Sequence, residues 1–110
     1  MSDTKYNGWA NYETWLTKLW IDNDEGTSMH AHDTAQEMLE NAATTDYLSQ
    51  EETACIELGD FLRDMFDDEA NELMPNASLL SDLLAAALRA VDWYEISESY
   101  INDIKQSQAA

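Results

Sequence analysis

Apolar side chains along this chain recur every three or four residues, and this spacing is the strongest constraint on its fold. No segment alternates apolar and polar residues at period two, as a half-buried strand does. The 110 residues include only one proline and three glycines, so few positions interrupt a helix. The pattern therefore predicts an all-α protein, a compact bundle of about five helices joined by short loops.

Capping residues delimit several of the expected helices. Asn11 is predicted to cap the first helix, because its side-chain oxygen can accept from free amides of the first turn. Ser49 with Glu52 forms a capping box for the third helix, and Asp92 with Glu95 has the same spacing before the fifth. The expected helices span residues 11–24, 28–42, 50–73, 77–91 and 93–106.

Residues 7–26 hold three of the four tryptophans and are predicted to organise the fold. Gly8 permits a turn before the first helix, and Gly26 is predicted to end that helix as a left-handed C-terminal cap. Thr27 or Ser28 is then expected to cap the second helix. Helical spacing predicts a single buried face of the first helix, formed by Tyr12, Trp15, Leu16, Leu19 and Trp20.

The later helices carry longer apolar stripes. The fourth helix is the most apolar, with five leucines between residues 79 and 88, and is predicted to be the central one. Trp15, Trp20 and Trp93 are predicted core residues, whereas Tyr6, Trp9 and Tyr47 fall outside the stripes. The stripes of the third and fifth helices are Cys55, Leu58, Phe61, Leu62, Met65 and Phe66, and Trp93, Ile96, Tyr100, Ile101 and Ile104.

The length fits one domain, residues 1–110, with loosely ordered ends at 1–6 and 107–110. A single cysteine, Cys55, excludes an internal disulfide and favours a reducing compartment. No apolar run approaches the roughly 20 residues that a membrane span needs, and the N-terminus lacks the apolar core of a signal peptide. We therefore expect a cytoplasmic protein with no membrane contact.

Net charge is the unusual feature of the composition, with 23 acidic against 5 basic residues and a formal charge of −18. Phosphates are repelled by such a surface, so direct nucleic-acid binding is not expected. The expected partners are cationic: metal ions, a basic protein, or the basic groove of a nucleic-acid-binding protein.

The third helix concentrates this charge in an acidic ridge formed by Glu57, Asp60, Asp64 and Asp68, spaced three and four residues apart. One carboxylate per turn recurs about every 5.4 Å, comparable to phosphates at about 3.4 Å along one nucleic-acid strand. The ridge can occupy the place of a phosphate backbone, or it can be an ordinary solvated face. The full predicted partner-binding surface is Glu57, Asp60, Asp64, Asp67, Asp68, Glu72, Asp22, Asp24 and Glu25.

Catalysis and metal binding have little support in the sequence. His30 and His32 stand two apart on a helix and point to different sides, and a zinc site needs three or four ligands. His32 is expected to pack and His30 to be exposed. Cys55 lies on an apolar stripe, where a thiol is usually inert. No phosphate-binding loop or nucleophile elbow is present, so we predict no enzyme, no metal and no cofactor.

Residues 7–15 read N-G-W-A-N-Y-E-T-W, and residues 19–24 read L-W-I-D-N-D. These motifs resemble a family of small acidic proteins carried by phages, plasmids and bacterial genomes, whose mark is N-G-W-x-N-Y-E-T-W followed by L-W-x-D-N-D. The resemblance implies no catalytic residues, but it does imply a mobile-element origin. Small acidic phage proteins include anti-CRISPR and antirestriction inhibitors, several of which imitate nucleic acid.

Three functions remain open. The favoured one is a non-enzymatic inhibitor of a host-defence nucleic-acid-binding protein, either a Cas effector or a restriction enzyme, that acts through the acidic surface. The alternative is a structural or regulatory interaction module, including a homodimer, that binds through its Trp9–Tyr12 end. A metal-binding protein or small hydrolase ranks last.

Overall fold

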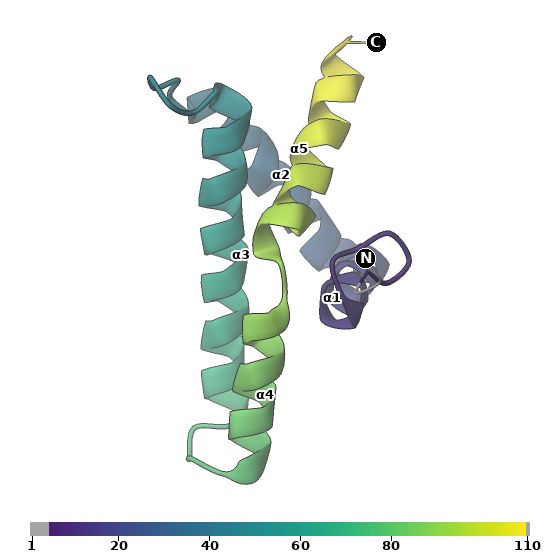
Figure 1. The fold of residues 1–110 in the computed structure, drawn as a ribbon, viewed down its shortest axis with the longest axis vertical. Coiled ribbons are helices and arrows are strands. Elements are labelled where there is room, and N and C mark those ends of the chain that lie inside the picture. Colours follow the sequence, from purple (N-terminus) through teal and green to yellow (C-terminus); the bar gives the residue numbers. More distant parts are fainter. Residues whose placement is uncertain (1–4, 110) are drawn as a thin grey trace.

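The computed structural model describes residues 5–109 and confirms the all-α class with five helices (Figure 1). The described residues contain no strand, only an isolated bridge between Tyr6 and Trp9. The observed bounds lie within two or three residues of the expected ones. The helices are α1 (Tyr12–Asn23), α2 (Glu25–Asn41), α3 (Gln50–Leu73), α4 (Leu79–Ala90) and α5 (Trp93–Ala109).

α3 is the longest helix, at 24 residues, and forms the spine of the molecule. Figure 1 shows α5 and α2 beside its N-terminal half and α4 beside its C-terminal half. The most extensive contact is between α3 and α5, through fully buried Leu58, Leu62, Ile96 and Ile101. The predicted stripes of α3 and α5 therefore face the core, with Phe61, Met65 and Phe66 only partly buried.

The N-terminal turn is a short hairpin. Asn7 and Gly8 both have positive φ, 48° and 88°, as a type I′ turn requires. The backbone N–H of Tyr6 donates to the Trp9 carbonyl at 2.7 Å, and that of Trp9 donates to the Tyr6 carbonyl at 2.8 Å. The hairpin places the ring of Tyr6 5.0 Å from that of Trp15, so it packs against the first turn of α1.

Asn11 caps α1 as predicted, since its Oδ1 accepts from the Thr14 N–H at 2.9 Å. Its Nδ2 also donates to the Ala90 carbonyl at the end of α4, at 2.7 Å. The hydroxyl of buried Thr14 donates to Asn11 Oδ1 and accepts from the Asp92 N–H at 2.8 Å. Glu95 does not complete the expected capping box, because its carboxylate accepts from the Ala10 N–H at 2.8 Å.

The buried face of α1 is not the predicted one. Thr14 and Ile21 are its buried residues, whereas Trp20 is 70% exposed and Tyr12 is 47% exposed. Thr14 must face inward because its hydroxyl binds the amide of Asp92 at the start of α5. That requirement turns much of the aromatic face toward solvent. Of the three predicted core tryptophans, Trp93 is buried as predicted, Trp15 is only partly buried, and the prediction for Trp20 is wrong.

Gly26 does not end α1 but lies in the first turn of α2. Asp24 alone separates the two helices and caps α2, since its carboxylate accepts from the N–H and the hydroxyl of Thr27. The boundary between the two helices is therefore set by the side-chain cap of Asp24 on α2, and not by a glycine C-cap on α1. The capping boxes at Ser49 with Glu52, and at Ser78 with Ser81, close the N-termini of α3 and α4.

α4 is the most apolar helix, as expected, but the prediction that it is central is wrong. It has no buried residue and contacts only α1 and α3 among the described helices. α5 takes the central position instead. At the chain ends, α5 continues to Ala109, so residues 107–109 are helical rather than loose. Residues 1–4 and 110 lie outside the described part of the chain.

Candidate partner-binding surface

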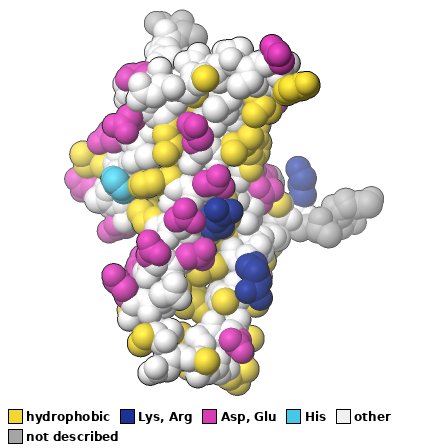
Figure 2. All heavy atoms as spheres, turned by 90° about the vertical axis from the view of Figure 1, so that its left-hand side faces the viewer, with side chains coloured by type: hydrophobic (Ala, Val, Ile, Leu, Met, Phe, Trp, Pro, Cys, Tyr) yellow, Lys and Arg dark blue, Asp and Glu magenta, His cyan; other side chains and the backbone are white. Residues whose placement is uncertain are grey.

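The four carboxylates of the acidic ridge all lie on the exposed side of α3. α3 buries Ala54, Cys55, Leu58, Gly59 and Leu62 against the other helices, which turns the ridge to solvent. Figure 2 shows this side of the molecule, where acidic side chains follow one another down the face with apolar and basic side chains between them. The predicted ridge is therefore present as a surface feature.

Arg63 partly neutralises the middle of the ridge. Its guanidinium lies 3.4 Å from Asp60 Oδ1 and 3.5 Å from Asp64 Oδ1. These side chains are between 49% and 68% exposed, so the pairs are exposed ion pairs that contribute little stability. Nine of the 24 residues of α3 are acidic and one is basic, so a strong local excess of negative charge remains.

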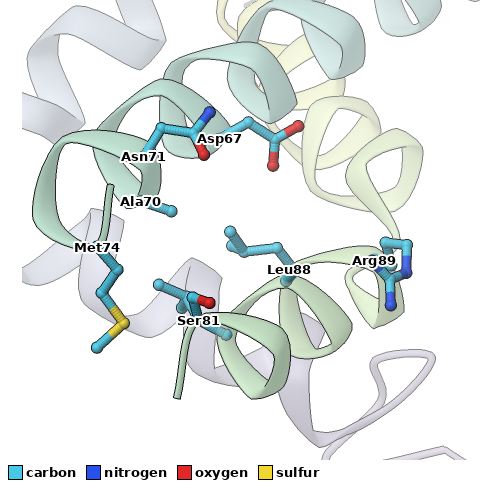
Figure 3. A pocket seen from close by; sticks show the side chains of 9 residues that line it. Asp67, Ala70, Asn71, Met74, Ser81, Leu88 and Arg89 are labelled. Carbon is cyan, nitrogen blue, oxygen red and sulfur yellow. The ribbon is translucent and has the colours of Figure 1, made fainter. Parts of the chain in front are cut away.

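Asp67 stands apart from the ridge. It is half-buried at the edge of a groove of about 360 Å³ between the C-terminal half of α3 and α4. Figure 3 shows Asp67 on the α3 side and Arg89 on the α4 side of this groove, with Leu88 toward its centre and Ser81 at the end near Met74. Asp67 therefore faces α4 rather than the outer surface, whereas Glu72 near the end of α3 is exposed.

The second predicted acidic patch has structural roles at two of its three residues. Asp22 accepts from Lys18 Nζ at 2.6 Å and from the Tyr100 hydroxyl at 3.1 Å. Asp24 caps α2, and hydrogen bonds from the Thr27 hydroxyl and N–H lower the pKa of its carboxyl. All three residues are exposed, and Glu25 is the one that takes no part in these contacts.

Glu69 is an acidic residue outside the predicted partner-binding surface. It lines two grooves together with Asp24 and Phe66, with volumes of about 420 and 360 Å³. α3 and the α1–α2 corner therefore bring Glu69 and Asp24 to the same region. Glu69 follows Asp68 directly in the acidic run, which is a visible signal, but only the packing of α2, which Asp24 caps, against α3 shows its relation to Asp24.

Aromatic side chains form a second exposed surface around α1. Tyr6, Tyr12 and Trp15 pack together in edge-to-face and tilted arrangements, with ring centroids between 5.0 and 5.7 Å apart. Trp20 lies on the rim of the groove that Phe66 and Leu88 line. Trp9 packs partly against the core, and Lys18 Nζ lies 6.0 Å from the Trp9 ring. Tyr47, in the α2–α3 loop, is 92% exposed.

The candidate nucleophile of the sequence is Cys55, and its candidate metal ligands are His30 and His32. Burial, followed by the charge of Glu98, raises the pKa of the Cys55 thiol to about 11, so it stays protonated at neutral pH. The His32 side chain is 52% exposed, which contradicts its predicted packing. His30 is exposed as predicted, and its ring centroid lies 5.6 Å from that of Phe61 with the two rings tilted. Within residues 5–109, no three His, Cys, Asp or Glu side chains are grouped to hold a metal ion.

These features define a class: an acidic all-α protein whose described residues form five helices, with nine of its 23 acidic residues on the longest one. The chain belongs to a family of unknown function, DUF7249, which it matches over residues 2–109. No curated protein and no solved structure matches it. In the part of the chain that the structure describes, none of the helices has the length and apolarity needed to cross a membrane.

Proposed function

We propose that the protein is a non-enzymatic inhibitor that binds the basic groove of a nucleic-acid-binding protein through the acidic ridge on α3. The observation that carries this proposal is the ridge itself: Glu57, Asp60, Asp64 and Asp68 are all exposed along one face of a helix with a single arginine. Carboxylates repeated at helical pitch offer a basic groove a row of charge in place of phosphates.

The charge of the whole protein supports the same proposal. A protein of formal charge −18 is attracted to a basic groove over a long range, which gives fast and salt-sensitive association. The protein resembles small acidic proteins of phages and plasmids, and this makes host-defence proteins the favoured targets. The proposed function is therefore of the anti-CRISPR or antirestriction type.

The test is inhibition of DNA cleavage by a panel of purified Cas effectors and restriction enzymes at low and high salt. The triple variant Asp60→Asn, Asp64→Asn, Asp68→Asn is expected to lose about tenfold or more in inhibition. Its matched control changes Asp33→Asn, Glu37→Gln and Glu40→Gln on α2, which removes the same charge from exposed positions. Equal loss in both variants, or inhibition that ignores the ridge, would refute the assigned surface.

A second candidate rests on the aromatic surface of α1. Trp20 is 70% exposed beside a groove lined by Leu16, Phe66 and Leu88, and exposed tryptophans are frequent anchors for protein partners. In this alternative the protein is a regulatory interaction module, and its charge serves solubility. Target binding that Trp20→Ala abolishes, and that the triple ridge variant leaves intact, would favour this alternative.

A further inference from the structure

The outward face of α4 is apolar along its whole length. Eight residues of the helix are exposed, and six of them are leucine or alanine. At 100° per residue, these six fall within about 120° of the helix surface. Leu79 is 73% exposed, Leu80 61% and Leu83 57%. The six residues, which we name the α4 face, are Leu79, Leu80, Leu83, Ala86, Ala87 and Ala90.

The α4 face has the size of an interaction surface. It offers on the order of 500 Å² of apolar area, at the upper end of what monomeric proteins expose. A specific interface needs about 600–800 Å² from each partner. The polar rim that surrounds any such interface supplies the remainder.

Charge identifies the kind of partner that fits. α4 carries one acid, Asp82, and one base, Arg89, so its formal charge is zero, whereas each of the other four helices is net negative. Two copies of a protein of formal charge −18 repel each other least where their neutral helices meet. The α4 face therefore suits a second copy of this chain.

Asp82 and Arg89 also define an orientation. They stand seven residues apart, two helical turns, on the same flank of the α4 face, and neither takes part in an ion pair within residues 5–109. When two antiparallel helices are related by a two-fold axis perpendicular to both, the same flank of each helix faces the same side of the dimer. Asp82 of one copy then lies on the same side of the dimer as the partner's Arg89. By symmetry, Arg89 of the first copy lies on the same side as the partner's Asp82.

The sizes of the apolar residues agree with this orientation. In an antiparallel pair, the leucine end of one α4 face, Leu79 and Leu83, lies against the alanine end of the other, Ala86 and Ala90. Large side chains opposite small ones allow two helices to interdigitate without a void. A parallel pair places leucine against leucine at one end, and it also separates Asp82 from the partner's Arg89.

The shape of the monomer is consistent with a missing neighbour at α4. The C-terminal half of α3 and α4 extend as a two-helix hairpin away from the other helices (Figure 1). The radius of gyration is 15.0 Å, compared with about 13 Å for a compact domain of this length. Pairing two hairpins gives a four-helix arrangement, in which each α4 is covered on both sides.

From these observations, we propose that the protein forms an antiparallel, two-fold symmetric dimer through the α4 face. The dimer leaves the acidic ridge of both copies exposed, because the ridge lies on the side of α3 that no helix covers. This self-association is independent of the proposed inhibition, so each can fail without the other.

The first test is sedimentation equilibrium of the full chain between about 1 and 100 μM, expected to give a Kd in the micromolar range. Added salt strengthens the dimer, because it screens the repulsion between two acidic copies. Leu83→Glu is expected to give a monomer with unchanged circular dichroism, whereas the control Tyr47→Glu still dimerises. A monomer at all concentrations and salts, or a dimer unaffected by Leu83→Glu, overturns the proposal.

The second test addresses orientation through charge reversal. Asp82→Arg alone and Arg89→Asp alone each place like charges opposite each other twice, and each is expected to raise the dimer Kd about tenfold. The double variant restores both pairs and returns the Kd to within about threefold of the wild type. A double variant as weak as the single ones contradicts the antiparallel arrangement.

Discussion

At the scale of single residues, the N-terminal motif is explained by hydrogen bonds rather than by chemistry. Asn11 caps its own helix and also binds the last carbonyl of α4, while Thr14 binds both Asn11 and the amide of Asp92. Glu95 holds the amide of Ala10 from the other side. The motif therefore ties the first helix to the α4–α5 corner, about 80 residues away in sequence.

Thr14→Val tests this junction. Valine has the shape of threonine but leaves the amide of Asp92 without its acceptor, so we expect a loss of about 1–3 kcal/mol in the free energy of unfolding. Thr14→Ser keeps the hydroxyl and should cost about 1 kcal/mol or less. Urea denaturation followed by tryptophan fluorescence measures both, and equal costs for the two variants would contradict the hydrogen-bond explanation.

At the scale of elements, one glycine determines how closely the two central helices approach. A Cβ added at Gly59 in α3 would lie 3.4 Å from the backbone of Trp93 and 3.5 Å from Ser97 Oγ on α5. Gly59 is buried. A Cβ alone would fit in ordinary van der Waals contact, but the further atoms of a larger side chain such as valine must push the helices apart. Gly26 in α2 is the opposite case, because its added Cβ meets only Asp24 Oδ2 at 4.0 Å.

These two glycines make a matched pair of predictions. Gly59→Val should destabilise the protein by about 1–3 kcal/mol through overpacking at the α3–α5 contact. Gly26→Ala should stabilise it by about 0.5 kcal/mol, since alanine restricts the unfolded chain without a clash. Thermal or urea unfolding of both variants measures the difference. A neutral Gly59→Val would mean that α3 and α5 can separate at no cost.

The five helices could be predicted from the sequence because caps and apolar spacing are local signals. Ser49 with Glu52 and Asn11 behave as predicted, and the stripes from Cys55 to Phe66 and from Trp93 to Ile104 face the core. The exposed faces could not be predicted in the same way. Trp20 and Leu83 have the spacing of core residues, but which face a helix buries depends on which neighbours cover it.

At the scale of the whole molecule, the formal charge of −18 opposes compaction. Ion pairs neutralise this charge only locally. Lys18 pairs with Asp22, Arg63 with Asp60 and Asp64, and Lys105 with Glu51. With nine acids on α3 alone, mutual repulsion acts on the folded state more strongly than on the expanded unfolded chain.

We therefore expect added NaCl to raise the melting temperature, by about 5 °C between low and high salt, as screening reduces this repulsion. Circular dichroism in the Leu83→Glu background, which is expected to be monomeric, keeps dimer formation from contributing. The triple ridge variant should start from a higher melting temperature and respond less to salt. A melting temperature that falls with salt would show that favourable ion pairs outweigh repulsion.

The sequence by itself determined the helical class, the approximate bounds of all five helices, most of their caps and the acidic character of α3, because each depends on residues close together in the chain. Only the tertiary structure decided which faces are covered. It put α5 rather than α4 at the centre, turned Trp20 outward so that Thr14 could bind Asp92, and brought Glu69 beside Asp24. These outcomes depend on contacts between distant segments, which spacing along one helix does not contain.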